Sequence, residues 1–192
     1  MPRAVCPRCE RPASTCLCAT LPAPLAHGTE LLILQHPAEA GHAKNTAAFL
    51  TLGLQSARRL RGEVFDATWA VPGTVLLYPG GGDAAAEAPP GGIRRLILLD
   101  GSWRQSRRLL THNPWLAALP RLSLPEQVSR YTIRRAHRPG QLSTLEAGLH
   151  ALARLEGDPH RFQPLWAAFD RFVADQRARR RPTSAPQRRV CG

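Results

Sequence analysis

The sequence is poor in acidic residues and almost free of lysine. Its 192 residues include 14 Asp and Glu against 26 Lys and Arg, which gives a formal net charge of +12, and Lys44 is the single lysine. A basic surplus of this size indicates a polyanionic partner, with nucleic acids first in line. GC-rich codon usage explains why arginine replaces lysine, but it does not explain the excess of base over acid.

The sequence also lacks the segments that carry a chain into or across a membrane. No apolar run approaches the roughly 20 residues that span a bilayer. The N-terminus has no apolar stretch of the kind found in signal peptides. We therefore expect a cytoplasmic protein with no membrane partner. Stable disulfides are rare in that compartment, so the five cysteines need another explanation.

Four of the five cysteines cluster near the N-terminus, at Cys6, Cys9, Cys16 and Cys18. Their spacing is C-x2-C-x6-C-x-C, and four thiolates can close a tetrahedral structural zinc site that leaves no position for water. The segment has too few apolar residues to fold unaided. A zinc knuckle is therefore favoured over the two alternatives, which are a redox pair and unrelated reduced thiols.

Short apolar runs that alternate with helical patterns predict an α/β fold, with a parallel sheet covered by helices on both faces. The predicted strands are 30–36, 74–78, 95–100 and 121–124, and the predicted helices are 45–54, 103–110, 142–155 and 162–173. We expect three units: the zinc knuckle over 1–22, a catalytic domain over 23–178 and a basic, disordered tail over 179–192.

Three predicted strands end in residues that can meet a ligand, because ligands bind parallel sheets beyond the carboxyl ends of their strands. These ends are His36-Pro37, Tyr78-Pro79-Gly80 and Asp100-Gly101-Ser102-Trp103. A lone histidine before proline is more often a strand terminator with a satisfied ring than a catalyst. The first end also leads through Lys44 to a helix start, where an anion can bind.

The third strand end carries the most suggestive chemistry. A carboxylate at a sheet rim, such as Asp100, can act as a base, and Trp103 can offer a π face to a cation. The alternative is structural, because Asp followed by Ser before a helix is commonly an N-cap. A similar string from Asp66 to Trp69 lacks both the apolar strand and the glycine, so we treat it as unrelated.

An arginine-rich loop precedes the third predicted helix. Four arginines and a tyrosine crowd into it: Arg130, Tyr131, Arg134, Arg135 and Arg138. Basic side chains interleaved with an aromatic suit contacts with the RNA backbone and its bases. The alternative is an ordinary solvated loop, although the arginine density is well above the average for this chain.

These elements, in this order, resemble the DTW-domain family from Cys6 to about Ala147. The resemblance is carried by the four-cysteine knuckle with Arg11-Pro12 inside it, His36-Pro37, Lys44-Asn45-Thr46, Leu77-Tyr78-Pro79, Leu99-Asp100-Gly101-Ser102-Trp103, Asn113-Pro114-Trp115 and Leu142-Ser143-Thr144-Leu145-Glu146-Ala147. One departure is Ser102, where the family name implies threonine. Both side chains carry a hydroxyl, so a capping or hydrogen-bonding role survives.

The resemblance implies a SPOUT-like knotted parallel sheet that holds S-adenosylmethionine. It further implies transfer of the 3-amino-3-carboxypropyl group from that donor to N3 of a tRNA uridine, with release of methylthioadenosine. Zinc would be a structural ion, tRNA the partner, and the oligomeric state either monomer or homodimer. Two alternatives are a SPOUT-type RNA methyltransferase that uses the same donor and a non-enzymatic, zinc-containing RNA-binding protein.

The resemblance also implies roles for individual residues. The catalytic candidates are Asp100, Ser102 and Trp103, with Asp100 as the base for uridine N3 or as an anchor for the ammonium group of the donor. The donor-binding candidates are Tyr78, Pro79, Gly80, Leu99, Asp100, Trp103, Leu124, Leu142, Ser143 and Thr144. The RNA-binding candidates are Lys44, Arg130, Arg134, Arg135 and Arg138. The metal ligands would be Cys6, Cys9, Cys16 and Cys18.

Overall fold

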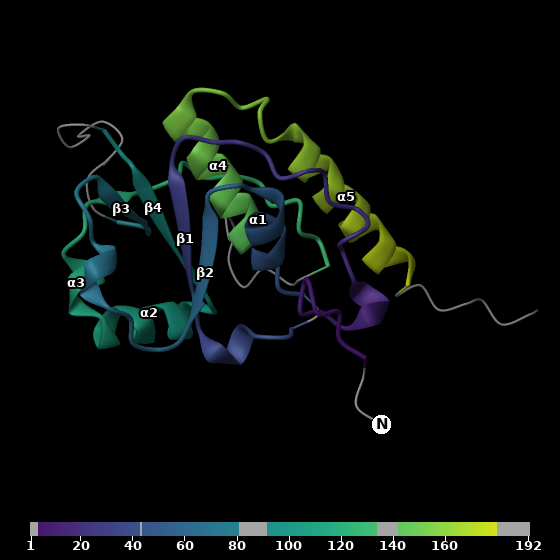
Figure 1. Ribbon diagram of the computed structural model, residues 1–192, viewed down its shortest axis with the longest axis horizontal. Coiled ribbons are helices and arrows are strands. Elements are labelled where there is room, and N and C mark those ends of the chain that lie inside the picture. The colour runs from purple at the N-terminus through teal and green to yellow at the C-terminus, as the bar shows by residue number, and fades with distance from the viewer. Residues whose placement is uncertain (1–3, 43, 81–91, 134–141, 180–192) are drawn as a thin grey trace, which may run out of the picture.

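A five-stranded parallel sheet forms the centre of the protein. The computed structural model describes residues 4–42, 44–80, 92–133 and 142–179 (Figure 1). The strands are β1 (Glu30–Gln35), β2 (Ala57–Arg61), β3 (Thr74–Leu77), β4 (Arg95–Asp100) and β5 (Arg121–Leu122). They pair in the order β2-β1-β4-β3-β5, and every pairing is parallel. The predicted parallel α/β architecture is confirmed.

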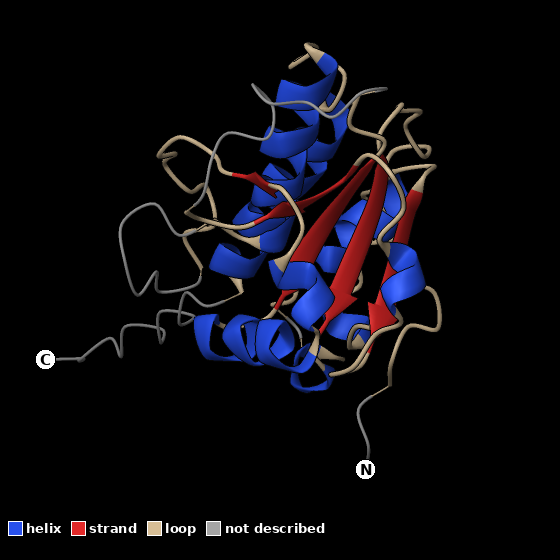
Figure 2. Cartoon of the chain, turned by 90° about the vertical axis from the view of Figure 1, so that its left-hand side faces the viewer, coloured by secondary structure: helices blue, strands red, loops and turns tan. Residues whose placement is uncertain are grey.

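Helices follow the strands along the chain and cover the sheet. They are α1 (Ala47–Gly53), α2 (Trp103–His112), α3 (Pro114–Ala117), α4 (Thr144–Glu156) and α5 (Gln163–Ala178), with short 3-10 turns η1 (Ala13–Thr15), η2 (Pro37–Glu39) and η3 (Ala67–Trp69). In Figure 2 the strands fan out side by side with helices around them. The tail predicted from residue 179 lies, apart from Arg179, outside the described residues.

Alternate residues of the central strands face two separate hydrophobic layers, as the pleat of a strand requires. Leu31, Ile33, Leu96 and Leu98 point toward α1, α4 and α5. Leu32, Leu34, Leu76 and Ile97 point the other way, toward α2 and α3. Because both faces are buried, β1 and β4 appear in the sequence as continuous apolar runs rather than as alternating patterns.

The edge strand β2 is an element that the sequence analysis did not predict. Its sequence is Ala-Arg-Arg-Leu-Arg, and each of its residues is half-buried or exposed, with none fully buried. Among the described strands it pairs with β1 alone. Arg59 and Arg61 both pair with Glu10 of the N-terminal segment, at N–O distances of 2.8 and 2.5 Å. An arginine-rich edge strand has no apolar pattern in its sequence, so it can be recognised as a strand only from its pairing with β1.

Capping boxes begin the two helices that border the sheet's carboxyl edge. The Ser102 hydroxyl accepts the Gln105 N–H, and the Gln105 side chain accepts the Ser102 N–H, at the start of α2. Ser143 and Glu146 form the same arrangement at the start of α4. These reciprocal bonds hold the first turn of each helix in place. Ser143 is thus the N-cap of α4, inside the range 142–155 predicted for this helix.

Gly53 lets α1 and α5 approach closely, and we expect its replacement by alanine to destabilise the protein. A Cβ at position 53 would overlap Cδ2 of Leu165, which is fully buried. Overpacking of this kind costs about 1 to 3 kcal/mol, measurable as a lower free energy of unfolding in urea. Gly28→Ala is the control, because its Cβ would meet nothing closer than a Glu156 oxygen at 3.9 Å. Equal stability of the two variants would contradict this packing.

Candidate functional site

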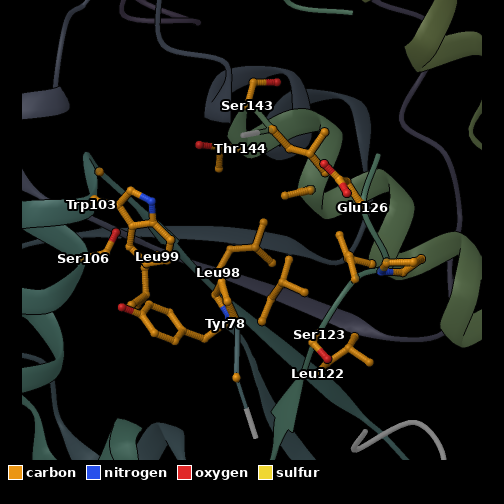
Figure 3. A pocket seen from close by; sticks show the side chains of 18 residues that line it. Tyr78, Leu98, Leu99, Trp103, Ser106, Leu122, Ser123, Glu126, Ser143 and Thr144 are labelled. Atoms are coloured by element: carbon orange, nitrogen blue, oxygen red, sulfur yellow. The ribbon is translucent and has the colours of Figure 1, made fainter. Parts of the chain in front are cut away.

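A cavity of about 570 Å³ opens at the carboxyl ends of β3, β4 and β5 (Figure 3). β3 and the turn after it contribute Leu77, Tyr78, Pro79 and Gly80; β4 and α2 contribute Leu98, Leu99, Gly101, Trp103 and Ser106; β5 and its loop contribute Leu122, Ser123, Leu124, Pro125 and Glu126; the start of α4 contributes Leu142, Ser143, Thr144 and Ala147. A parallel sheet places ligand sites at this edge. The cavity is therefore the candidate functional site.

The structure gathers nine of the ten predicted donor-binding residues around this one cavity. They are Tyr78, Pro79, Gly80, Leu99, Trp103, Leu124, Leu142, Ser143 and Thr144. The tenth, Asp100, does not line it. Of the three predicted catalytic residues, Trp103 lines the cavity, whereas Asp100 and Ser102 do not. The hydroxyl of Ser102 instead caps α2. Segments that are distant in the sequence thus meet at one place.

Asp100 ends β4 as a buried carboxylate, 3% exposed, that accepts three hydrogen bonds. Gln35 Nε2 and Asn45 Nδ2 each donate to Oδ2 at 2.7 Å, and the Thr144 hydroxyl donates to Oδ1 at 2.5 Å. The donors come from β1, from the turn before α1 and from the start of α4. Asp100 therefore ties three segments together, and Thr144 is its link to the cavity.

One acidic side chain lines the cavity, and the sequence analysis did not single it out. Glu126 is the only charged group among the described lining residues, although the whole chain carries a net charge of +12. The other lining residues include six leucines, two aromatic residues and several hydroxyl groups. Its position in the sequence could have indicated it, because Pro125-Glu126 directly follows the short predicted strand 121–124, whose carboxyl end faces this edge of the sheet. A cavity with this charge favours a cation over an anion.

Two aromatic rings form the wall opposite Glu126. Tyr78 and Trp103 meet edge to face, with ring centroids 5.5 Å apart and planes at 85°. Figure 3 shows both rings on one side of the cavity and Glu126 on the other. Trp103 is 41% exposed, so part of its ring lies open to solvent. Burial raises the pKa of Tyr78, which keeps its hydroxyl protonated and able to donate.

The four N-terminal cysteines come together as the sequence predicted. Their sulfur atoms all lie within 4.8 Å of one another. The Sγ atoms of Cys6 and Cys18 are 3.8 Å apart, and so are those of Cys9 and Cys16. A tetrahedral ion with Zn–S bonds of about 2.3 Å places its ligand atoms about 3.8 Å apart. Two of the sulfur pairs already have this spacing, so the four cysteines form a group that could hold a metal ion.

The thiols of this cluster differ in acidity. Backbone N–H groups of Cys9 and Arg8 lower the pKa of Cys6 to about 6. Burial, followed by the neighbouring thiols, raises the pKa of Cys18 to about 12. Crowded thiols resist joint ionisation, and a bound divalent cation removes that penalty because it deprotonates its thiol ligands outright.

Arg11 connects the cysteine cluster to the candidate site. Its guanidinium is buried and lies 4.6 Å from the centre of the Phe172 ring. Its Nε donates to the Thr15 carbonyl at 3.0 Å, and its Nη1 donates to the Asn45 carbonyl. Burial lowers the pKa of this guanidinium. The side chain of Asn45 donates a hydrogen bond to Asp100, so Asn45 contacts both Arg11 of the cysteine segment and Asp100.

Two of the five predicted RNA-binding residues, Lys44 and Arg130, lie within the described part of the chain. Lys44 is exposed, and its carbonyl accepts the hydroxyl of Tyr131 at 2.6 Å. Arg130 pairs with Asp170 of α5 at 3.1 Å and lies 4.9 Å from the Trp166 ring centre. The other three, Arg134, Arg135 and Arg138, lie outside the described residues. Their predicted contact with RNA is neither confirmed nor contradicted.

Comparison with known proteins identifies the family. The family model described as "DTW domain" matches residues 3–177, which is nearly the whole chain. The chain belongs to the DTW-domain family. The segment Asp100-Gly101-Ser102-Trp103, which we compared with the family name, runs from the last residue of β4 to the first residue of α2, and its Gly101 and Trp103 line the cavity.

Curated relatives of this DTW protein carry a common name. A Drosophila melanogaster protein, "tRNA-uridine aminocarboxypropyltransferase 2", is 34% identical over 175 residues, which is 83% of this chain and 70% of the relative. The Mus musculus protein of the same name is 35% identical over 170 residues, 80% of this chain and 57% of its own length. "tRNA-uridine aminocarboxypropyltransferase A" of Arabidopsis thaliana is 27% identical over 198 residues, 81% of this chain and 74% of the relative.

Two further findings concern solved structures and membrane-spanning helices. No solved structure matches the chain. Within the described residues, no helix combines the length and the apolar character needed to cross a bilayer.

Proposed function

We propose that this protein transfers the 3-amino-3-carboxypropyl group of S-adenosylmethionine to N3 of a uridine in tRNA, in the cytoplasm. The observation that carries the proposal is the cavity's charge: in a strongly basic protein, the described residues that line the cavity include a single carboxylate, that of Glu126, within largely apolar walls. Such a site suits a donor that is a sulfonium cation. The names of the relatives supply the group transferred and the acceptor.

The cavity's walls support this donor in three ways. The ring of Trp103 offers a π face, which attracts a sulfonium or ammonium group. Glu126 offers the ammonium group a counter-charge. The start of α4 reaches the cavity through Ser143 and Thr144, and the positive end of a helix favours a carboxylate such as that of the donor. Holding the methylene carbon, rather than the methyl, in line with N3 is the main catalytic task.

The reaction forms one bond and breaks one. Uridine N3 attacks the methylene carbon next to sulfur, the C–S bond breaks, and its electron pair leaves with methylthioadenosine. N3 must lose its proton, so a base is useful. The Thr144 oxygen is the group we assign to this step, with its own proton moving to Asp100 Oδ1, to which it already donates at 2.5 Å. Asp100 then acts as a base through Thr144 rather than by direct contact.

The cysteine cluster is proposed to hold a structural zinc ion through Cys6, Cys9, Cys16 and Cys18. The sulfur spacing of 3.8 Å supports this assignment. Four thiolate ligands leave no site for a substrate, so the ion would supply stability and no chemistry. The division into a knuckle over 1–22, a catalytic domain over 23–178 and a tail over 179–192, and a SPOUT-like knot in the catalytic domain, belong to the same proposal.

Mass spectrometry of nucleosides tests the function. Unmodified tRNA is incubated with the protein and S-adenosylmethionine, and we expect a uridine heavier by one aminocarboxypropyl group together with free methylthioadenosine. Trp103→Ala should weaken donor binding, whereas Trp69→Ala, in the similar string on η3 away from the cavity, should not. A gain of one methyl group would instead show an RNA methyltransferase. Binding of tRNA without measurable donor binding would show a non-enzymatic RNA-binding protein.

A further inference from the structure

Two arginines border the cavity on the side of its aromatic wall. Arg107 lies on α2, one turn after Trp103 and next to the cavity-lining Ser106. Arg121 begins β5, and its guanidinium carbon lies 5.3 Å from the centre of the Tyr78 ring. Burial raises the pKa of Tyr78, and the positive charges of both arginines act in the opposite direction and lower it. The two basic groups thus stand near the same aromatic side chain from different elements.

Neither arginine is neutralised by a carboxylate within the part of the chain that the structure describes. Arg121 Nη1 donates only a long bond of 3.4 Å to the Gly80 carbonyl. Neighbouring Arg108, by contrast, pairs with Glu63 at 3.1 Å, and Arg59 and Arg61 pair with Glu10. Arg107 is exposed, so its charge faces solvent beside the partly open ring of Trp103.

Charge therefore changes sign between the cavity and its border. The lining carries one carboxylate and, among described residues, no base, whereas the border carries two arginines beside two aromatic rings. A cationic donor and a polyanionic acceptor would each find complementary charge in such an arrangement. Aromatic rings flanked by basic groups bind unstacked bases and their backbone. An acidic protein partner could pair with the arginines, but it has no nucleobase that could stack on the exposed ring of Trp103.

We propose that Arg107 and Arg121 form a phosphate-binding border that holds the RNA backbone on either side of the uridine entering the cavity. The pair is called the border arginines below. This inference rests on the proposed function for the identity of the RNA. It places the acceptor on the α2 and β5 side, a surface separate from the arginine-rich loop predicted from the sequence. The border arginines would bind phosphate without reading sequence.

A binding experiment tests the border arginines without involving the donor. Fluorescence anisotropy would measure the affinity of the protein for labelled, unmodified tRNA at several salt concentrations. We expect Arg107→Ala/Arg121→Ala to weaken binding about tenfold, since each exposed ionic contact contributes a few-fold. The slope of log affinity against log salt should become shallower by about 1.4, because each lost phosphate contact on single-stranded RNA removes about 0.7.

Two further variants make the result specific. Arg58→Ala/Arg177→Ala removes the same charge from exposed positions on β2 and α5, and β2 is the opposite edge strand of the sheet from β5. Its affinity should change less than twofold. Arg107→Lys/Arg121→Lys keeps the charge and should restore most of the affinity. Equal losses in the two alanine pairs, or no loss in the border pair, would overturn the proposal.

The proposed function and the border arginines fail in distinguishable ways. If the border variant loses tRNA affinity but the wild-type protein forms no aminocarboxypropyl uridine, the transfer is wrong and the RNA surface stands. If the wild-type protein forms the product and the border variant shows unchanged KM for tRNA, the surface is wrong and the transfer stands. We expect a raised KM for tRNA, an unchanged kcat and unchanged affinity for S-adenosylmethionine. Loss of border-variant affinity for an acidic polypeptide but not for tRNA would also overturn the proposal.

Discussion

Replacing Asp100 by asparagine is expected to abolish transfer and to destabilise the protein. The substitution puts an amide where Gln35, Asn45 and Thr144 now donate to a carboxylate. Either the amide nitrogen faces the Gln35 and Asn45 donors, or it faces Thr144, whose hydroxyl must then accept and loses the acceptor for its own proton. An unsatisfied buried polar group costs about 1 to 3 kcal/mol, which urea unfolding would measure. Loss of the base should lower turnover at least about a hundredfold, measured by methylthioadenosine release.

Two controls separate chemistry from stability. Asp66→Asn makes the same change on an exposed carboxylate that caps η3 through the Thr68 N–H, and it should affect neither turnover nor stability measurably. Thr144→Val removes the hydroxyl that joins Asp100 to the cavity but leaves both amide donors in place. It should lower kcat and spare the affinity for S-adenosylmethionine. Wild-type turnover in a folded Thr144→Val protein would disprove the proposed proton path.

Disrupting the cysteine cluster is expected to have the second large effect. Cys9 is 2% exposed and packs in the same hydrophobic cluster as Leu17 and Phe49. If the cluster holds zinc, Cys9→Ser should abolish the bound equivalent and cost at least about 4 kcal/mol, since lost metal ligands are among the most destabilising changes. For a chain of this size that corresponds to a melting temperature lower by about 8 to 16 °C.

Metal analysis of the purified protein and melting with and without a chelator would check this prediction. Cys191→Ser is the matched control, because it removes the cysteine that lies far from the others in the sequence, and it should retain both the metal and the stability. A protein that contains no metal, and whose melting temperature is insensitive to chelation, would restore the redox or reduced-thiol interpretation of the cluster.

Disrupting the cysteine cluster should also weaken donor binding in the cavity, because Arg11 connects the two sites. Arg11 bonds to the Asn45 carbonyl, and Asn45 bonds to Asp100. When the loop that carries Arg11 loosens, Asn45 is no longer held in place. We therefore expect donor affinity to fall in Cys9→Ser but not in Cys191→Ser, as isothermal titration calorimetry would show.

Local patterns in the sequence determined most of the elements that build the site. The apolar runs of β1 and β4 are long enough to identify buried strands, because a strand covered on both faces excludes polar side chains. Ser143 and Glu146 are spaced for a capping box, which needs only residues three positions apart. The cysteine spacing likewise predicted that the four thiols come together in one cluster that could hold a metal ion, since four thiols within a short segment have few other uses. Each of these signals depends on neighbours along the chain.

Other features could not be predicted from residues that are neighbours in the sequence, and only the tertiary structure decided them. β2 is recognisable only by its pairing with β1, because its arginines give it no apolar pattern. Asp100 stands behind the cavity rather than in it, since donors from three distant segments converge on its carboxylate. Glu126 is the one charged side chain among the described lining residues because the fold brings the loop after β5 to the same cavity as the start of α4. The meeting of Arg107 and Arg121 beside Tyr78 depends in the same way on where α2 and β5 pack, and long-range packing of this kind is what a periodic pattern does not encode.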